Sequence, residues 1–139
     1  MSTRLKEKEE KILQVLEALA EESAKRKLIV VEGKKDVIAL RALGVAGTVL
    51  TVKTGGKSFL DTVSEIKKMD VLEVILFLDF DRRGKEGTKR LKQSLERAKI
   101  KPNVKFWRAL SALAGKEIQC IESLTAYLNT LRAKVNAQR

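Results

Sequence analysis

Three carboxylates at the ends of two apolar runs are the residues of this chain best suited to catalysis. Glu32 follows the apolar run 28–31, and Asp79 and Asp81 follow the apolar run 74–78. Short β-branched runs that end at a polar break are typical of parallel strands buried on both faces. The carboxyl ends of such strands form the edge at which open α/β sheets bind ligands. The sequence therefore predicts that the three side chains meet at one edge of a sheet.

The spacing of Asp79 and Asp81 indicates a bound cation. In an extended backbone, residues two apart point the same way, and like charges held close together are unfavourable without a positive ion. Oxygen ligands suit Mg²⁺, which takes one or two carboxylates and fills its octahedron with waters and phosphate oxygens. Histidine is absent and Cys120 is the only cysteine, so few other catalytic routes are open. We expect Mg²⁺, with Mn²⁺ as an alternative ion.

The chain is strongly basic, with a formal net charge of +11 and a sequence pI near 9.9. Such a charge on a small protein favours a polyanionic partner, with nucleic acid as the leading candidate. The basic residues expected to form a phosphate-binding rim beside the carboxylates are Lys34, Lys35, Lys57, Arg82 and Arg83. The alternative is a lysine-rich, solvated surface of the kind found in proteins from hot environments.

The spacing of apolar residues predicts the elements that position these side chains. Strands are expected at 27–31, 48–52, 73–78 and 103–107, and helices at 4–24, 34–43, from 58 onward, 83–98 and 116–136. Strands that alternate with helices imply an α/β fold with a four-stranded, mainly parallel sheet and right-handed crossovers. We expect a single domain over residues 1–139, in which the N-terminal helix 4–24 and the C-terminal helix 116–136 are additions to the sheet-bearing core.

Two segments resemble the signatures of the Toprim domain. They are Glu32-Gly33-Lys34-Lys35-Asp36-Val37-Ile38-Ala39-Leu40 and Asp79-Phe80-Asp81-Arg82-Arg83-Gly84. Toprim is a metal-binding module shared by bacterial primases, type IA and type II topoisomerases, OLD-family nucleases and small ribonucleases that mature ribosomal RNA. The similarity covers roughly residues 27–107 and implies a Rossmann-like fold in a stand-alone protein of archaeal type. It also implies that Glu32 is the general acid or base and that Asp79 and Asp81 bind Mg²⁺.

The resemblance implies a Mg²⁺-dependent hydrolase or transferase that acts on nucleic-acid phosphodiesters, with RNA processing favoured over a role on DNA. A topoisomerase needs a tyrosine nucleophile in a separate domain, and the only tyrosine, Tyr127, lies among apolar residues. A primase needs a polymerase scaffold and a zinc module, for which this chain has neither the length nor the ligands. The competing hypothesis is a noncatalytic nucleic-acid-binding subunit of an RNA-processing or DNA-repair assembly. A homodimer or a larger processing complex stays open.

Other chemistries fit the sequence less well. Haloacid-dehalogenase-like phosphatases need a second acidic site downstream, and no aspartate follows Asp81. Response-regulator receivers need an acidic pair after their first strand, where Glu32 stands alone. The loop 54–58 contains Gly-Lys-Ser, but Thr51 occupies the position of the first P-loop glycine, so we interpret this loop as a βα turn.

The aromatic residues give little indication of base recognition. Phe106 is expected in the core, and Trp107 is expected partly exposed at the end of the fourth strand. Contacts with nucleic acid should then be mostly to phosphate and sugar, with strong salt dependence and little sequence preference.

The remaining composition predicts a cytoplasmic protein that does not enter a membrane. No apolar stretch approaches the roughly 20 residues needed to span a bilayer, and the amino terminus is charged. Cys120 lies among apolar residues and is expected to be a small buried hydrophobe, which agrees with a reducing compartment.

Overall fold

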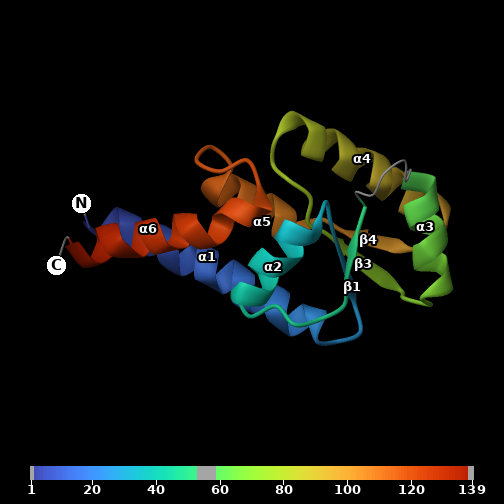
Figure 1. The fold of residues 1–139 in the computed structure, drawn as a ribbon, viewed down its shortest axis with the longest axis horizontal. Helices are drawn as coiled ribbons and strands as arrows, with labels where there is room; N and C mark the ends of the chain where they lie inside the picture. The colour runs from blue at the N-terminus through green and yellow to red at the C-terminus, as the bar shows by residue number, and fades with distance from the viewer. Residues whose placement is uncertain (1, 53–58, 138–139) are drawn as a thin grey trace.

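The computed structural model describes residues 2–52 and 59–137 (Figure 1). Its elements, in chain order, are α1 (Ser2–Ser23), β1 (Leu28–Val31), α2 (Lys34–Ala42), β2 (Val49–Thr51), α3 (Phe59–Lys68), β3 (Glu73–Leu76), α4 (Arg82–Arg97), β4 (Lys101–Asn103), α5 (Lys105–Ala114), the short 3₁₀ helix η1 (Ile121–Ser123) and α6 (Leu124–Ala137). Strands and helices alternate from β1 to β4, which is the α/β order that the sequence predicts.

The four strands form one parallel sheet in the order β2-β1-β3-β4. The two central strands, β1 and β3, are adjacent, and Val30 is paired with Leu76. All of β1 is buried, and so is β3 from Val74 onward, because helices cover both faces of the sheet. The predicted four-stranded sheet flanked by helices is confirmed, and the carboxyl ends of β1 and β3 lie next to each other.

The sheet separates two apolar layers. Ile29, Val31 and Ile75 point toward one face and pack with residues of α1, α2, α5 and α6. Leu28 and Val30 point the other way and pack with residues of α3 and α4. Figure 1 shows this division, with α3 and α4 grouped at one side of the molecule and α1, α5 and α6 at the other.

The first and last helices pack against each other, so the start of α1 and the end of α6 lie at the same end of the molecule (Figure 1). Two ion pairs join the N-terminal helix to the C-terminal part of the chain: Arg132 Nε lies 3.1 Å from Glu9 Oε2, and Lys8 Nζ lies 2.7 Å from Glu117 Oε1. Both pairs are partly exposed, so each contributes at most about 1 kcal/mol. The apolar contacts between the helices, such as those of Ile12, are the larger contribution to packing.

In the described part of the chain, no helix has both the length and the apolar character needed to cross a membrane.

The fourth predicted strand is wrong in its position. Residues 101–103 form β4, and a helix, α5, begins at Lys105. The side chain of Asn103 accepts a hydrogen bond of 2.9 Å from the backbone N–H of Lys105 and so turns the chain at the end of the strand. Phe106, Leu110 and Ala114 are buried and follow each other at four-residue spacing, which is the period of a helix.

The predicted start of the last helix at residue 116 is also wrong. The chain leaves α5 at Ala114, and α6 begins only at Leu124, after the turn η1. The segment between them hydrogen-bonds to the chain that follows β3, since the Phe80 N–H donates to the Gln119 carbonyl oxygen at 2.7 Å. A continuous helix from 116 would take that carbonyl for its own hydrogen bonds.

Candidate metal centre

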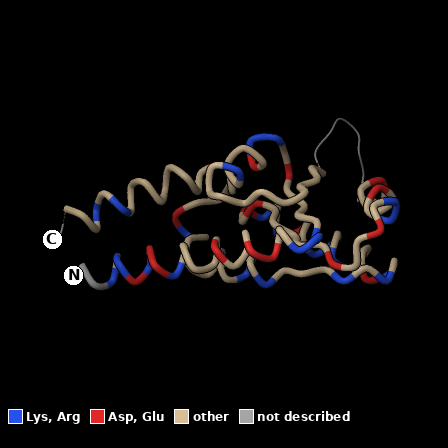
Figure 2. The backbone as a smooth tube through the Cα atoms, turned by 90° about the horizontal axis from the view of Figure 1, so that it is seen from below, with Lys and Arg blue, Asp and Glu red and all other residues tan. Residues whose placement is uncertain are grey.

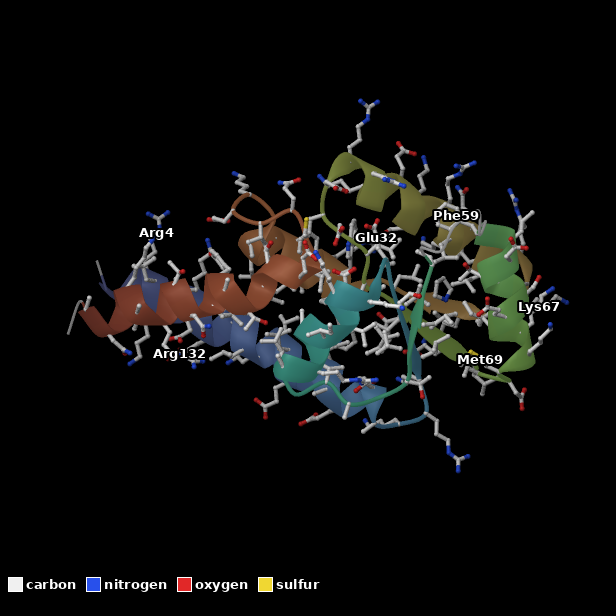
Figure 3. The ribbon with its side chains drawn as sticks, viewed as in Figure 1. Arg4, Glu32, Phe59, Lys67, Met69 and Arg132 are labelled. Atoms are coloured by element: carbon white, nitrogen blue, oxygen red, sulfur yellow. The ribbon has the colours of Figure 1, made fainter. Side chains whose placement is uncertain are left out.

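Glu32, Asp79 and Asp81 lie at the carboxyl edge of the sheet. Glu32 directly follows β1, Asp79 lies three residues after the end of β3, and Asp81 is the N-cap of α4. These segments meet because β1 and β3 are adjacent and parallel. Figure 3 shows Glu32 in the middle of the molecule, between α2 and α4. The structure therefore brings together the three carboxylates that the sequence singles out.

Asp79 is a buried carboxylate with a fixed orientation. Its side chain belongs to a residue that is only 9% exposed, and Oδ1 accepts a hydrogen bond of 3.0 Å from the Ile121 backbone N–H. A charged acceptor makes such a bond stronger than a neutral one. The turn η1, which comes 42 positions later in the chain, therefore holds one Asp79 oxygen in place.

Trp107 fixes the backbone that carries Asp79. Its indole N–H donates to the Leu78 carbonyl oxygen at 2.9 Å, with a longer contact of 3.4 Å to the Asp79 carbonyl oxygen. Its ring lies 6.1 Å from the Phe80 ring, at an angle of 39°. Trp107 is therefore a positioning residue; it is partly exposed, as the sequence predicts, but it lies in α5 and not at the end of a strand.

Asp81 begins α4 and faces the same edge. Its backbone is extended, and Oδ1 accepts a hydrogen bond of 2.7 Å from the Gly84 N–H, as in other aspartate caps. Its second carboxylate oxygen has no hydrogen-bond partner among the residues that the structure describes. Gly84 packs so tightly against the Asp79 peptide that a Cβ there would overlap the Asp79 carbonyl oxygen. The glycine allows α4 to start directly against the chain that carries Asp79.

Glu32 has a strongly perturbed acidity. Burial raises the pKa of Glu32 from 4.5 to about 8, helped by a hydrogen bond with the Asp79 side chain and by the charges of Asp79, Asp81 and Asp36. Burial also raises the pKa of Asp36, whose Oδ2 accepts a hydrogen bond of 3.0 Å from the Gly33 N–H. At neutral pH the cluster therefore holds a proton on Glu32, which relieves the repulsion between Glu32 and Asp79.

The donor set of the cluster suits a hard divalent ion. Among the residues that the structure describes, no three acidic, histidine or cysteine side chains are grouped as a complete set of ligands. Mg²⁺ does not require one, because one or two carboxylates with waters and phosphate oxygens complete its shell. Asp79 and Asp81 supply carboxylate oxygens at one sheet edge, and a cation bound there would offset the repulsion between them. The chemistry of the residues fits Mg²⁺ or Mn²⁺.

Part of the expected basic rim lies beside the carboxylates. Lys34 and Lys35 are exposed in the first turn of α2, and Arg82 and Arg83 are exposed in the first turn of α4. Both helices start at the carboxyl edge, so these four cations lie beside the cluster. Lys57, the fifth residue of the expected rim, falls outside the described residues.

Several residues of the site could not be recognised from the sequence. Ile121 contributes only its backbone N–H, so no side-chain signal points to it. Trp107 is 29 and 28 positions away in the chain from Leu78 and Asp79, whose carbonyl oxygens it contacts, so local spacing does not connect them. Cys120, expected to be buried, is partly exposed, and burial together with the nearby acidic groups raises its thiol pKa. Gly84, which follows the Asp-x-Asp segment, is the one local feature of the sequence that indicates close packing between α4 and the Asp79 backbone.

The acidity of Glu32 predicts how the metal-free protein responds to pH. Because its folded pKa of about 8 lies above the unfolded value of 4.5, its contribution to stability is present below about pH 4.5 and is lost as pH rises to about 8. We expect Glu32→Gln to abolish this loss, which should amount to about 1–2 kcal/mol once solvent screening at a half-exposed group is allowed for. Urea unfolding of both proteins in EDTA between pH 5 and 9 measures it. The same change in the free energy of unfolding with pH in both proteins would contradict this expectation.

The chain matches the family model described as Toprim domain over residues 26–108. It is 40% identical over 121 residues to a UPF0292 protein of Methanocaldococcus jannaschii, an alignment that covers 86% of this chain and 91% of that protein. A UPF0292 protein of Archaeoglobus fulgidus is 36% identical over 114 residues, which are 82% of this chain and 86% of that protein. These similarities extend through the sheet, the carboxylate cluster and most of the flanking helices.

A solved structure has the same architecture. A putative protein from Aquifex aeolicus superimposes with a TM-score of 0.67 and 25% sequence identity, over 79% of this chain and 94% of that one. The parallel sheet and its covering helices are therefore an arrangement already known from experiment.

Proposed function

The chain belongs to the Toprim domain family, with archaeal UPF0292 relatives, and from this premise we propose that it is a Mg²⁺-dependent enzyme that cleaves or transfers nucleic-acid phosphodiesters in RNA processing. Toprim domains form a family of metal-binding domains related to nucleic acids. The observation that carries the proposal is the meeting of Glu32, Asp79 and Asp81 at the ligand-binding edge of a parallel sheet, where the exposed lysines and arginines of the first turns of α2 and α4 also lie.

Each group of the cluster has a role that its surroundings support. Asp79 and Asp81 would hold the ion, because both are fixed by backbone N–H groups at one oxygen. When bound, Mg²⁺ would supply positive charge to polarise the scissile phosphate. Glu32, protonated at neutral pH, would donate its proton to the leaving oxygen, for which a pKa near the working pH is favourable.

The experiment that tests the proposal is a cleavage assay on single-stranded and structured RNA and on the corresponding DNA, with Mg²⁺, Mn²⁺ or EDTA. We expect metal-dependent cleavage of RNA that disappears in Asp79→Asn/Asp81→Asn. Asparagine keeps an oxygen that accepts from the Ile121 N–H and is itself a good helix cap, so this variant should fold. No cleavage of any substrate, with binding retained, would favour the noncatalytic binding subunit instead.

The rim cations predict how binding responds to salt. We expect Arg82→Ala/Arg83→Ala to weaken nucleic-acid binding equally for all sequences, because both side chains are exposed and would contact phosphate. The slope of log affinity against log salt should fall by about 0.7–0.9 for each lost contact. Fluorescence anisotropy at 50–300 mM salt measures this slope. Wild-type binding by the double variant at every salt concentration would show that the two arginines only solvate the surface.

A further inference from the structure

The basic charge of the chain is concentrated on one helix. α4 carries seven basic residues and two acidic ones, which gives it a net charge of +5 out of the formal +11 of the whole chain. By contrast, α1 mixes four basic residues with six acidic ones, and Figure 2 shows blue and red alternating along it from the N-terminus. The excess on α4 is therefore not a property of every helix in the protein.

The described structure shows no ion pair that ties the cations of α4 to the rest of the fold. Among the described residues, none of them forms an ion pair, whereas Lys8, Lys27 and Arg132 on other parts of the surface all do. Arg90 lies over the Phe59 ring, 5.9 Å from its centre. Cations on one helix that are not paired with carboxylates repel one another. Their presence on α4 therefore favours a role in binding an external anionic partner.

One row of these cations starts at the carboxylate cluster and runs along the helix. Arg82, Lys85, Lys89 and Lys92 follow each other at intervals of three, four and three residues, so they share one face. With a rise of 1.5 Å per residue the row is about 15 Å long, which is enough to contact several successive phosphates of a strand. The face of α4 that carries Leu91 and Leu95 is buried against the sheet, whereas Arg82, Lys85 and Lys89 are exposed and Lys92 is partly exposed.

We propose that α4 is a phosphate-binding track that leads one single strand of nucleic acid away from the carboxylate cluster. Lys85, Lys89 and Lys92 contact successive phosphates of the strand whose first bound phosphate lies at Arg82. The inference rests on the proposed function and extends it, because it gives the substrate a direction and a minimum length. Base stacking on Phe59 plays no part along the track, since Arg90 lies over the ring of Phe59, the aromatic residue packed beside α4.

The experiment compares Lys89→Gln/Lys92→Gln with Arg4→Gln/Lys134→Gln. The control removes the same charge from exposed positions on α1 and α6, and Figure 3 shows Arg4 at the far end of the molecule from α4. Binding of fluorescein-labelled trinucleotide and nonanucleotide RNA is measured by anisotropy in EDTA, so that no cleavage occurs. Thermal unfolding of each variant shows that it is folded.

We expect the wild type and the control to bind the nonamer more tightly than the trimer. In Lys89→Gln/Lys92→Gln the nonamer should lose roughly tenfold in affinity at low salt and its salt slope should fall by about 1.4, while the trimer is unaffected. Equal losses in the variant and the control, or wild-type binding by the variant, would overturn the track.

The outcome for the track is separable from the outcome for catalysis. If the nonamer effect appears and no substrate is cleaved with either metal, the track stands and the proposed chemistry fails. If RNA is cleaved and Arg82→Ala/Arg83→Ala binds weakly while Lys89→Gln/Lys92→Gln binds as wild type, the chemistry stands and the track fails.

Discussion

Replacement of Glu32 by Gln is expected to lower metal-dependent cleavage by roughly a hundredfold or more, which is the usual range for losing a general acid or base. Glutamine has nearly the same shape, and its amide can donate to Asp79 as the protonated carboxyl does. The fold and the nucleic-acid affinity should therefore be retained. Single-turnover cleavage, with anisotropy on the same RNA, measures the two properties separately.

A matched control for this variant is Glu86→Gln. Glu86 is an exposed glutamate in the first turns of α4, close in sequence to the rim but outside the carboxylate cluster. Its replacement makes the same change of side chain and should leave the cleavage rate within about twofold, because surface electrostatics contribute little. Full activity of Glu32→Gln would mean that Glu32 is a structural acid and that the mechanism is wrong.

Replacement of Gly84 by Ala is expected to be strongly destabilising, although alanine normally stabilises the interior of a helix by up to about 1 kcal/mol. The new Cβ would overlap the Asp79 carbonyl oxygen and lie 2.6 Å from the Asp79 carbonyl carbon. Both are backbone atoms that cannot move aside without shifting α4 or the chain after β3. We expect a loss of about 2–3 kcal/mol in the free energy of unfolding and a fall of about 10 °C in Tm.

Gly87→Ala provides the comparison within the same helix. A Cβ at Gly87 would lie 3.3 Å from Leu78 Cδ1 and 3.3 Å from Phe59 Cζ, which are the ends of side chains that can adjust. Its effect on the free energy of unfolding should stay within about 1 kcal/mol. Equal effects of the two substitutions in calorimetry would contradict the contact proposed between α4 and Asp79.

The part of the fold that carries the carboxylates follows from strong local signals. The runs ending at Glu32 and Asp79 are apolar and β-branched, and a parallel sheet buries such runs on both faces. Gly44 has a φ of +90° after α2, the left-handed conformation in which glycine commonly ends a helix, and it follows the predicted helix 34–43 directly. The structure therefore places three side chains from two separate segments at one edge, as strand order and spacing require.

The parts that were missed depend on contacts between distant segments. The alternation of Val104, Lys105 and Phe106 is too short to distinguish a strand from the first turn of a helix, and the helical period appears only when Leu110 and Ala114 are included. The hydrogen bonds that hold Asp79 and its backbone in place are donated by the indole N–H of Trp107 and the backbone N–H of Ile121. Neither can be read from local spacing, because each is set by how α5 and η1 pack on the sheet.

The central claim is that Asp79 and Asp81 bind a divalent ion, and titration of Mg²⁺ or Mn²⁺ into metal-free protein tests it most directly. Trp107 is the only tryptophan, and its indole donates to the backbone beside Asp79, so its fluorescence can follow the titration alongside calorimetry. We expect saturable binding in the wild type and none in Asp79→Asn/Asp81→Asn, which should be at least as stable as the metal-free wild type because two like charges are removed. Unchanged metal affinity in the double variant would contradict the account.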